Sequence, residues 1–350
     1  MKIKTITKYL LIGILISFIF SCASDGLDGM DGLNGTDGGN GIDGQDGADG
    51  QNASGKTYIY ITGNVTDAEA ATIIQNDYGS ITQFIYIRNT SQLTTLDLTG
   101  ISELVNLSIY SNSALTTLTI PDLTTVYEAI FYQDNPLVNS LNLPNLTSCT
   151  ALDIQPNGSL QSLDLSKLEI AGRIYIYNTL LTSINIPLLY EVNVFSFSVN
   201  QNLTSINLPE LLTIGQNFGG NTQIDQNPLL TSINFPKLAS LKDISISYNN
   251  SLVNFDLPLL TQGNLSIESN HSLTSINIPL LITFDSFYLY DNAISSARIN
   301  SYLNQFASIS PSITGKAIYL FGQTPSTPPT GQGITDKNTL ITNGNSVITD

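Results

Sequence analysis

Apolar residues return along most of this chain in a fixed pattern of three. The pattern reads N-x-x-[LV]-x-x-[LIF]-x-[LIF], and a typical copy runs from Asn200 through Leu203 and Ile206 to Leu208. Successive copies are 21 to 23 residues apart, except for one interval of 27 residues. A fixed period in this range predicts a solenoid, in which each repeat forms one coil and buries its apolar residues against its neighbours.

Each repeat contains two segments in which apolar and polar residues alternate, and we expect both segments to be short strands. The first is the apolar triplet, as in residues 181–186, and in seven copies a proline follows and ends it. The second comes just before the next asparagine, as in residues 152–154. Stacking of the coils then predicts a mainly β fold, a right-handed β-solenoid of about nine turns of about 22 residues.

The asparagines that begin the copies form one column when the repeats are aligned. We expect the column to lie at a turn, because asparagine tolerates left-handed backbone geometry and its amide can bond backbone groups of the adjacent coil. This predicted structural ladder comprises Asn112, Asn135, Asn157, Asn178, Asn200, Asn227, Asn249, Asn270 and Asn292.

The repeats resemble leucine-rich repeats, since residues 104–115 follow the signature L-x-x-L-x-L-x-x-N-x-x-L. The continuation L-x-x-I-x-I-P-x-x-L resembles the bacterial surface repeats of the BspA type and the receptor L-domain variety of β-helix. This resemblance covers about residues 84–292. It implies a binding protein and leaves the ligand open, because such folds carry many functions.

Two repeats depart from the pattern. Around Asn178 the apolar pair is displaced by one residue, to Ile174 and Ile176. Before Asn227 about five extra residues, including the Gly-Gly pair at 219–220, predict a protruding loop.

Both ends of a solenoid need caps, because an exposed core would aggregate. At the N-terminal end, residues 57–62 predict a strand, and a capping box at Thr66 predicts a helix to about Gln75. The C-terminal segment predicts a helix at 295–306, a strand at 317–321, a helix at 334–342 and a strand at 346–349.

The first residues of the chain have the composition of a targeting segment. Lys2, Lys4 and Lys8 precede an apolar run at residues 9–20, which is short for a membrane span. The run ends in Ile-Phe-Ser-Cys22, which resembles a bacterial lipoprotein signal, and the resemblance implies lipidation of Cys22. The alternative is an uncleaved anchor with an incidental cysteine.

Glycine then occupies every third position from residue 26 to residue 50, and Asp or Asn is the third residue of every triplet. Glycine at this period is what a collagen triple helix requires, so residues 25–52 could assemble a homotrimer. The tract is short and contains no proline, which favours a flexible acidic tether instead. The predicted domains are a signal peptide at 1–21, a lipidated tether at 22–56, an N-terminal cap at 57–90, the solenoid at 91–292 and an α/β cap at 293–350.

Composition narrows the classes of function. Charged residues make up 11% of the chain and the formal net charge is −16, so we expect no binding to nucleic acid. Motifs for a metal, a cofactor or a phosphate are absent from the sequence, and we predict no enzyme activity, no cofactor and no metal. Asp153 and Asp164, the nearest pair of carboxylates suited to polysaccharide cleavage, belong to different strands. Cys149 should be a buried core thiol, and His271 should be exposed in a turn without a partner.

The outward rows of the two kinds of strand are candidate binding surfaces. The triplet strands carry mainly Ser or Thr in one row and mainly Asn or Asp in the next, which predicts a solvated polar sheet. A binding face and an ordered-water face like that of ice-binding solenoids are alternatives. The other strands carry aromatic residues, which suit sugar rings and protein contacts, although tyrosine also favours sheets on propensity alone. The candidate ligand-binding residues are Tyr110, Phe131, Tyr175, Tyr177, Tyr288 and Tyr290.

Together these features predict a non-enzymatic lipoprotein of the bacterial outer membrane, held there by its lipid and exposed at the cell surface. It would present its repeats to a protein or glycan ligand, in adhesion or ligand capture. The alternative is a structural or spacer protein of the envelope without a dedicated ligand. A polysaccharide-degrading enzyme is a remote alternative.

Substitution of Cys22 tests the predicted anchor. We expect Cys22→Ala to abolish incorporation of a fatty-acid probe and to release the protein from the membrane fraction, because stable anchoring depends on the attached acyl chains. Cys149→Ala is the matched control and should be labelled like the wild type. Labelling of Cys22→Ala would contradict the lipoprotein assignment.

Overall fold

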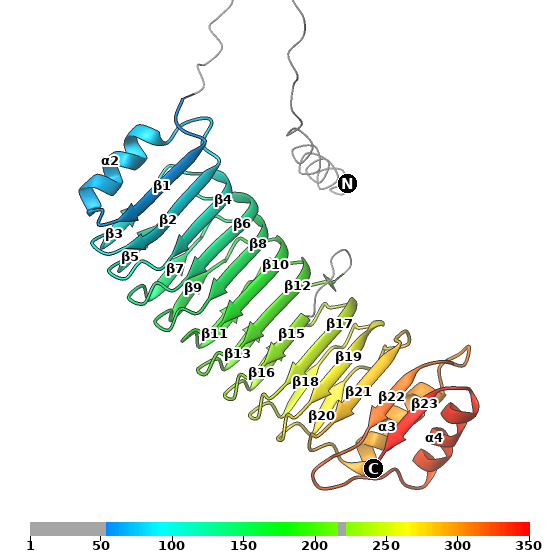
Figure 1. The fold of residues 1–350 in the computed structure, drawn as a ribbon. Helices are drawn as coiled ribbons and strands as arrows, with labels where there is room; N and C mark the ends of the chain where they lie inside the picture. The colour runs from blue at the N-terminus through cyan, green and yellow to red at the C-terminus, as the bar shows by residue number, and fades with distance from the viewer. Residues whose placement is uncertain (1–53, 216–221) are drawn as a thin grey trace, which may run out of the picture. The chain divides into compact units, whose positions relative to one another are not determined.

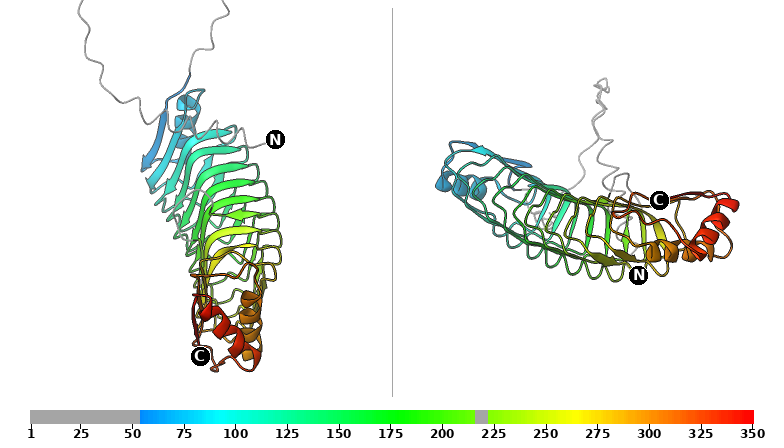
Figure 2. Two further views of the ribbon diagram at one scale, coloured as in Figure 1. Left: turned by 90° about the vertical axis from the view of Figure 1, so that its right-hand side faces the viewer. Right: turned by 90° about the horizontal axis from the view of Figure 1, so that it is seen from below.

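The computed structural model describes residues 54–215 and 222–350, which form a parallel β-solenoid of about 10 turns with about 22 residues per turn (Figure 1). The predicted solenoid and its period are therefore confirmed. Figure 2 shows that this part of the chain is an elongated, gently curved rod with helices at its two ends. The predicted signal peptide, Cys22, the Gly-X-Y tract and the predicted loop at 219–220 lie outside the described residues.

One parallel sheet runs along the whole rod, and we call it the long sheet. Its 14 strands follow one another in chain order, except that β14 and β15 both lie between β12 and β17. In the sequence, the extra residues of the 27-residue repeat thus separate β14 from β15. The register of the sheet continues in β15. The strands are β1 (Tyr58–Gly63), β2 (Phe84–Thr90), β4 (Glu103–Tyr110), β6 (Thr125–Gln133), β8 (Ser148–Gln155), β10 (Ile170–Tyr177), β12 (Glu191–Ser198), β14 (Thr213–Ile214), β15 (Thr222–Asp225), β17 (Ser240–Ser247), β19 (Gln262–Glu268), β21 (Ser286–Tyr290), β22 (Ala317–Leu320) and β23 (Ser346–Thr349).

The apolar triplets form the other set of strands, each three residues long, and we call these the short strands. They pair in parallel as separate sheets of two, two and five strands. In this order they are β3 (Thr95–Asp97) with β5 (Thr117–Thr119); β7 (Ser140–Asn142) with β9 (Ser162–Asp164); and β11 (Ser183–Asn185), β13 (Ser205–Asn207), β16 (Ser232–Asn234), β18 (Asn254–Asp256) and β20 (Ser275–Asn277).

The core is one continuous column of apolar side chains between the long sheet and the short strands. Leu203, Ile206 and Leu208 of one repeat are fully buried, because each packs against its equivalents in the coils on either side. Cys149 lies in this column, as predicted. Burial, with a further effect of Asp153, raises the pKa of its thiol to about 12, so the thiol stays protonated and unreactive at neutral pH.

The ladder asparagines other than Asn178 are buried and bond the backbone of the preceding coil. Asn249 shows the arrangement: its Oδ1 accepts a hydrogen bond from the backbone N–H of Asn227 at 3.1 Å, and its Nδ2 donates to the carbonyl of Ile224 at 2.9 Å. Each side chain therefore satisfies one buried donor and one buried acceptor that the strands leave unpaired. The same two contacts recur at Asn112, Asn157, Asn200, Asn227, Asn270 and Asn292.

Two details of the predicted ladder are wrong. The left-handed backbone belongs to the residue before the ladder position, such as Tyr248 with φ 54°, except at Asn157, which follows Pro156. No asparagine at a ladder position is itself left-handed. Asn178 is one of these preceding residues, with φ 51°, and its side chain is exposed. Thr179 takes the ladder position instead, and its backbone N–H and hydroxyl both donate to Oδ1 of Asn200.

The displaced member of that repeat is therefore the asparagine and not the apolar pair. Ile174 and Ile176 pair in register with Leu152 and Ile154 of the preceding strand. Strand register is fixed by burial of one face, since a slip of one residue would turn every apolar side chain outward. The turn has more freedom and accommodates the change.

The ladder also extends beyond the predicted column at both ends. Thr90 begins it, with its backbone N–H and hydroxyl donating to Oδ1 of Asn112. Gln323 ends it, because its Nε2 donates to the carbonyl of Leu289 and its Oε1 accepts from the N–H of Ile294. At the two ends of the ladder, where a neighbouring ladder residue is present on one side only, threonine or glutamine thus takes the place of asparagine.

Helix α2 (Asp67–Asp77) closes the N-terminal end and begins with the predicted capping box between Thr66 and Glu69. The Asp67 carboxylate accepts hydrogen bonds from the backbone N–H groups of Thr94 at 2.7 Å and Thr95 at 3.1 Å. These donors belong to the free edge of the first short strand, so the carboxylate replaces a neighbouring strand there.

Helix α3 (Ser296–Ala307) closes the other end of the short strands in a similar way. The Tyr302 hydroxyl accepts from the N–H of Ile276 at 3.0 Å and donates to the carbonyl of the same residue at 2.8 Å. Helix α4 (Gln332–Thr342) lies against α3 (Figure 1). The predicted helices and strands of both caps are confirmed, with bounds that differ by one or two residues.

Substitution of a ladder asparagine tests its role. We expect Asn249→Ala to lower the free energy of unfolding by about 2 to 4 kcal/mol, because a buried donor and a buried acceptor both lose their partners. Urea denaturation measures the change. The exposed neighbour Asn250 provides the control, and Asn250→Ala should stay within about 0.5 kcal/mol of the wild type. Equal stability of the two variants would show that the ladder does not stabilise the solenoid.

The N-terminal cap predicts a dependence of stability on pH. Hydrogen bonds from Thr94 and Thr95 lower the pKa of Asp67 to about 2, below its ordinary value of 3.8. A lowered pKa stabilises the folded state fully above the ordinary value, and the contribution is lost as pH falls toward 2. We therefore expect Asp67→Ala to be less stable than the wild type in thermal unfolding at pH 7, and the difference to shrink between pH 4 and pH 2. The exposed Glu128 serves as control, since Glu128→Ala should show a much smaller difference at either pH.

Candidate ligand-binding surface

The outward side chains of the long sheet form rows, because its strands are parallel and in register. Register places Tyr60 beside Tyr86, and Tyr175 between Asp153 and Ser196. Two neighbouring outward rows cross the sheet in this way from end to end. All six predicted aromatic residues belong to them, with Phe131, Tyr175 and Tyr288 in one row and Tyr110, Tyr177 and Tyr290 in the other.

The six residues do not form one site, since they lie at three separate places along the sheet. Tyr110 and Phe131 lie on β4 and β6, Tyr175 and Tyr177 on β10, and the remaining pair on β21. Between β10 and β21 one row contains serine and glutamine, and the other contains serine, Asp225 and Glu268. Each aromatic group must therefore be considered with its own neighbours.

The first group is enlarged by side chains of β1 and β2 that the sequence analysis did not single out. We call Tyr58, Tyr60, Phe84, Tyr86, Arg88 and Tyr110 the N-terminal aromatic patch. The ring centroids of Tyr58 and Phe84 are 4.6 Å apart and those of Tyr60 and Tyr86 are 5.1 Å apart, with interplanar angles of 13° and 11°. The rings stack because equivalent positions on neighbouring strands are about 4.8 Å apart.

Arg88 lies among these rings. Its Cζ is 5.5 Å from the ring centroid of Tyr60 and 5.8 Å from that of Tyr86, and its Nη1 donates to the Tyr110 hydroxyl at 3.0 Å. Tyr58 and Tyr60 are 48% and 50% exposed, because β1 is the edge strand of the sheet and no further ring stacks on them.

A period-two signal could have identified this patch from the sequence. Residues 58–61 read Tyr-Ile-Tyr-Ile and residues 84–87 read Phe-Ile-Tyr-Ile, with an aromatic ring at every second position. Residues 57–90 were predicted to be a cap, but their strands β1 and β2 continue the outward rows of the long sheet.

The middle group is built around an ion pair. Arg173 donates from Nε to Asp153 Oδ1 at 2.9 Å and from Nη2 to Oδ2 at 2.5 Å, and its Cζ lies 5.3 Å from the ring centroid of Tyr175. Tyr177 extends from the same strand and is exposed. Asp153 is thus held by a guanidinium on the long sheet, whereas Asp164 belongs to a short strand on a different sheet.

The C-terminal group is also enlarged, here by the cap. Tyr288 stacks on Tyr319 with 4.9 Å between ring centroids, and Tyr290 stacks on Phe321 at 5.4 Å. The cap strand β22 and Phe321, the residue that follows it, therefore add their rings to the outward rows of β21. Only the tertiary structure shows this, because Tyr319 and Phe321 belong to a segment without the repeat pattern.

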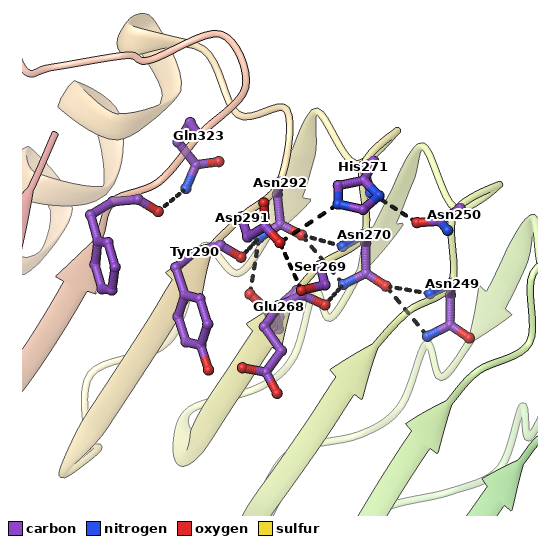
Figure 3. Close-up of polar contacts among 12 residues, drawn as sticks. Asn249, Asn250, Glu268, Ser269, Asn270, His271, Tyr290, Asp291, Asn292 and Gln323 are labelled. Atoms are coloured by element: carbon purple, nitrogen blue, oxygen red, sulfur yellow. Dashed lines mark hydrogen bonds and ion pairs between the residues drawn. The ribbon is translucent and has the colours of Figure 1, made fainter.

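The surface beside Tyr290 is acidic (Figure 3). Burial first, and then the charges of Asp225 and Asp291, raise the pKa of Glu268, so this carboxyl is less readily ionised than usual. His271 is exposed, as predicted, but it has a neighbour: its Nε2 lies 3.6 Å from Oδ2 of Asp291. No cluster of three or more His, Cys, Asp or Glu side chains suited to a metal ion occurs within residues 54–215 and 222–350.

The short strands present a polar surface that is partly bonded to itself. Nδ2 of Asn207 donates to Oδ1 of Asn185 at 2.6 Å, and Nδ2 of Asn234 donates to Oδ1 of Asn207 at 2.6 Å. These amides form the ladder hydrogen bonds expected of a solvated sheet. Next to them is a shallow depression of about 540 Å³, lined by Ser205, Asn207, Ser232, Asn234, Asn254 and Asp256 among others.

None of the helices in the described part of the chain is long and apolar enough to span a membrane. Comparison of the chain with known protein families, with curated proteins and with solved structures finds no match in any of the three. Its function must therefore be argued from its own residues.

Proposed function

We propose that this protein is a non-enzymatic lipoprotein of the bacterial outer membrane, anchored through Cys22 and exposed at the cell surface. It presents the outer face of the long sheet to a protein or glycan, in adhesion or ligand capture. The observation that carries this proposal is the pair of outward rows, in which stacked aromatic side chains recur on one rigid sheet. A Gly-X-Y tether at residues 25–52 would hold this sheet away from the membrane, as a single chain or as a homotrimer.

The physical character of the rows supports a binding role. Phe131 and Tyr177 are exposed, although burial of aromatic surface is favourable and a soluble protein rarely exposes contiguous apolar patches without a use. Tyrosine side chains have few rotatable bonds, so a rigid sheet presents them to a ligand at little entropic cost. Their ring faces and hydroxyls together suit a sugar or a protein surface.

Binding by the purified full-length chain to glycan and matrix-protein panels tests the proposal. We expect at least one ligand class to bind, and the combined change Tyr175→Ser, Tyr177→Ser and Tyr288→Ser to weaken it at least about tenfold, because exposed aromatic residues carry much of the energy at binding surfaces. The control removes three exposed leucines that lie outside the sheet, at positions 188, 212 and 280.

The control variant should bind like the wild type. Equal binding by the tyrosine variant would remove these residues from the site. Absence of binding to any ligand would favour the alternative, a structural or spacer protein of the envelope.

A further inference from the structure

The two arginines on the outer face of the long sheet are in different electrostatic situations. Arg173 makes two hydrogen bonds to the Asp153 carboxylate, so its charge is neutralised within the protein. Arg88 donates to the neutral phenol of Tyr110, and within the described residues it forms no ion pair with a carboxylate. A guanidinium has five N–H donors in a fork that matches a carboxylate, and one contact leaves most of the fork of Arg88 available.

We propose that the N-terminal aromatic patch binds a carboxylate-bearing sugar, such as a uronic acid unit of an acidic polysaccharide, through Arg88. The inference rests on the proposed function, since it names the ligand class for one end of the same sheet face. The Asp153–Arg173 pair shows, on the same sheet, the contact that the sugar carboxylate would make with Arg88.

Charge complementarity favours an anionic ligand at this point. The chain as a whole carries a net charge of −16 and contains only three arginines, so an arginine without a carboxylate partner on an exposed face is unusual here. Glu128, on β6, forms no ion pair with Arg88. The net negative charge of the body weakens general attraction of anions, so binding depends on the local contacts of Arg88.

The surroundings of Arg88 favour a sugar over an acidic peptide. Tyr60 has a ring face that no neighbouring strand covers, and such a face suits the C–H groups of a sugar ring. The guanidinium of Arg88 contacts the Tyr110 hydroxyl and lies against the rings of Tyr60 and Tyr86. Their phenol groups supply hydroxyls that can bond those of a sugar. The Tyr110 oxygen accepts from Arg88, so its own proton remains free to donate.

Titration calorimetry on the full-length chain tests the inference with two probes, polygalacturonate oligomers and the same oligomers after reduction of their carboxyl groups. We expect the acidic oligomers to bind, and both carboxyl reduction and Arg88→Gln to weaken binding at least about tenfold, because each removes a charge-assisted bidentate contact.

Arg298→Gln, on the exposed surface of α3, makes the same change in net charge and should alter affinity less than twofold. Thermal unfolding of Arg88→Gln establishes that the variant is folded, and Arg88→Lys, which keeps the charge without the fork, should bind with intermediate affinity.

Three results would overturn the inference: no binding of the acidic oligomers, equal binding of the reduced oligomers, or unchanged binding by Arg88→Gln. Tighter binding of polyglutamate than of the acidic sugar would show that the patch recognises an acidic peptide instead. The proposed function would be contradicted by a different result, namely that no ligand of the glycan and matrix-protein panels binds the protein. A panel ligand that depends on Tyr175, Tyr177 and Tyr288 would keep the proposed function even if Arg88 binds no sugar.

Discussion

Every coil of this solenoid must turn beside its own core, and the turn buries backbone N–H and carbonyl groups that the strands cannot pair. The ladder side chain of the next coil bonds one of each, as Asn249 does for the N–H of Asn227 and the carbonyl of Ile224. A buried polar group without a partner is costly, so this contact fixes the distance and the rotation between successive coils. Asparagine fits because its short amide offers a donor and an acceptor side by side.

The regular stacking that results has a direct consequence for the surface. When coils follow one another at constant spacing, equivalent residues fall into rows, and aromatic rings at equivalent positions stack at centroid distances of 4.6 to 5.4 Å. The rows cover the outer face of a sheet whose inner face is occupied by the core. Core residues and solvent-facing residues are therefore divided between the two faces of the same strands, and outward residues such as Tyr175 can change without disturbing the core.

The ends of the rod show how a repeat structure stops. At the short strands, Asp67 and Tyr302 bond the backbone groups that a further strand would have paired. Thr90 and Gln323 take the ladder position where the column of asparagines has no further member. Each of these four residues makes hydrogen bonds that a further repeat would otherwise make.

The sequence by itself determined the solenoid, its period, both kinds of strand and the cap helices, because periodic burial and capping are local properties of the chain. The sequence pattern also predicted the ladder asparagines, but wrongly included Asn178. The pattern does not show whether a shift of one residue lies in the strand or in the turn that follows it. Only the tertiary structure decided which outward side chains become neighbours. Arg88 meets Tyr60 and Tyr110 across three strands, and His271 meets Asp291 across two coils, because register between coils brings together residues about one repeat apart.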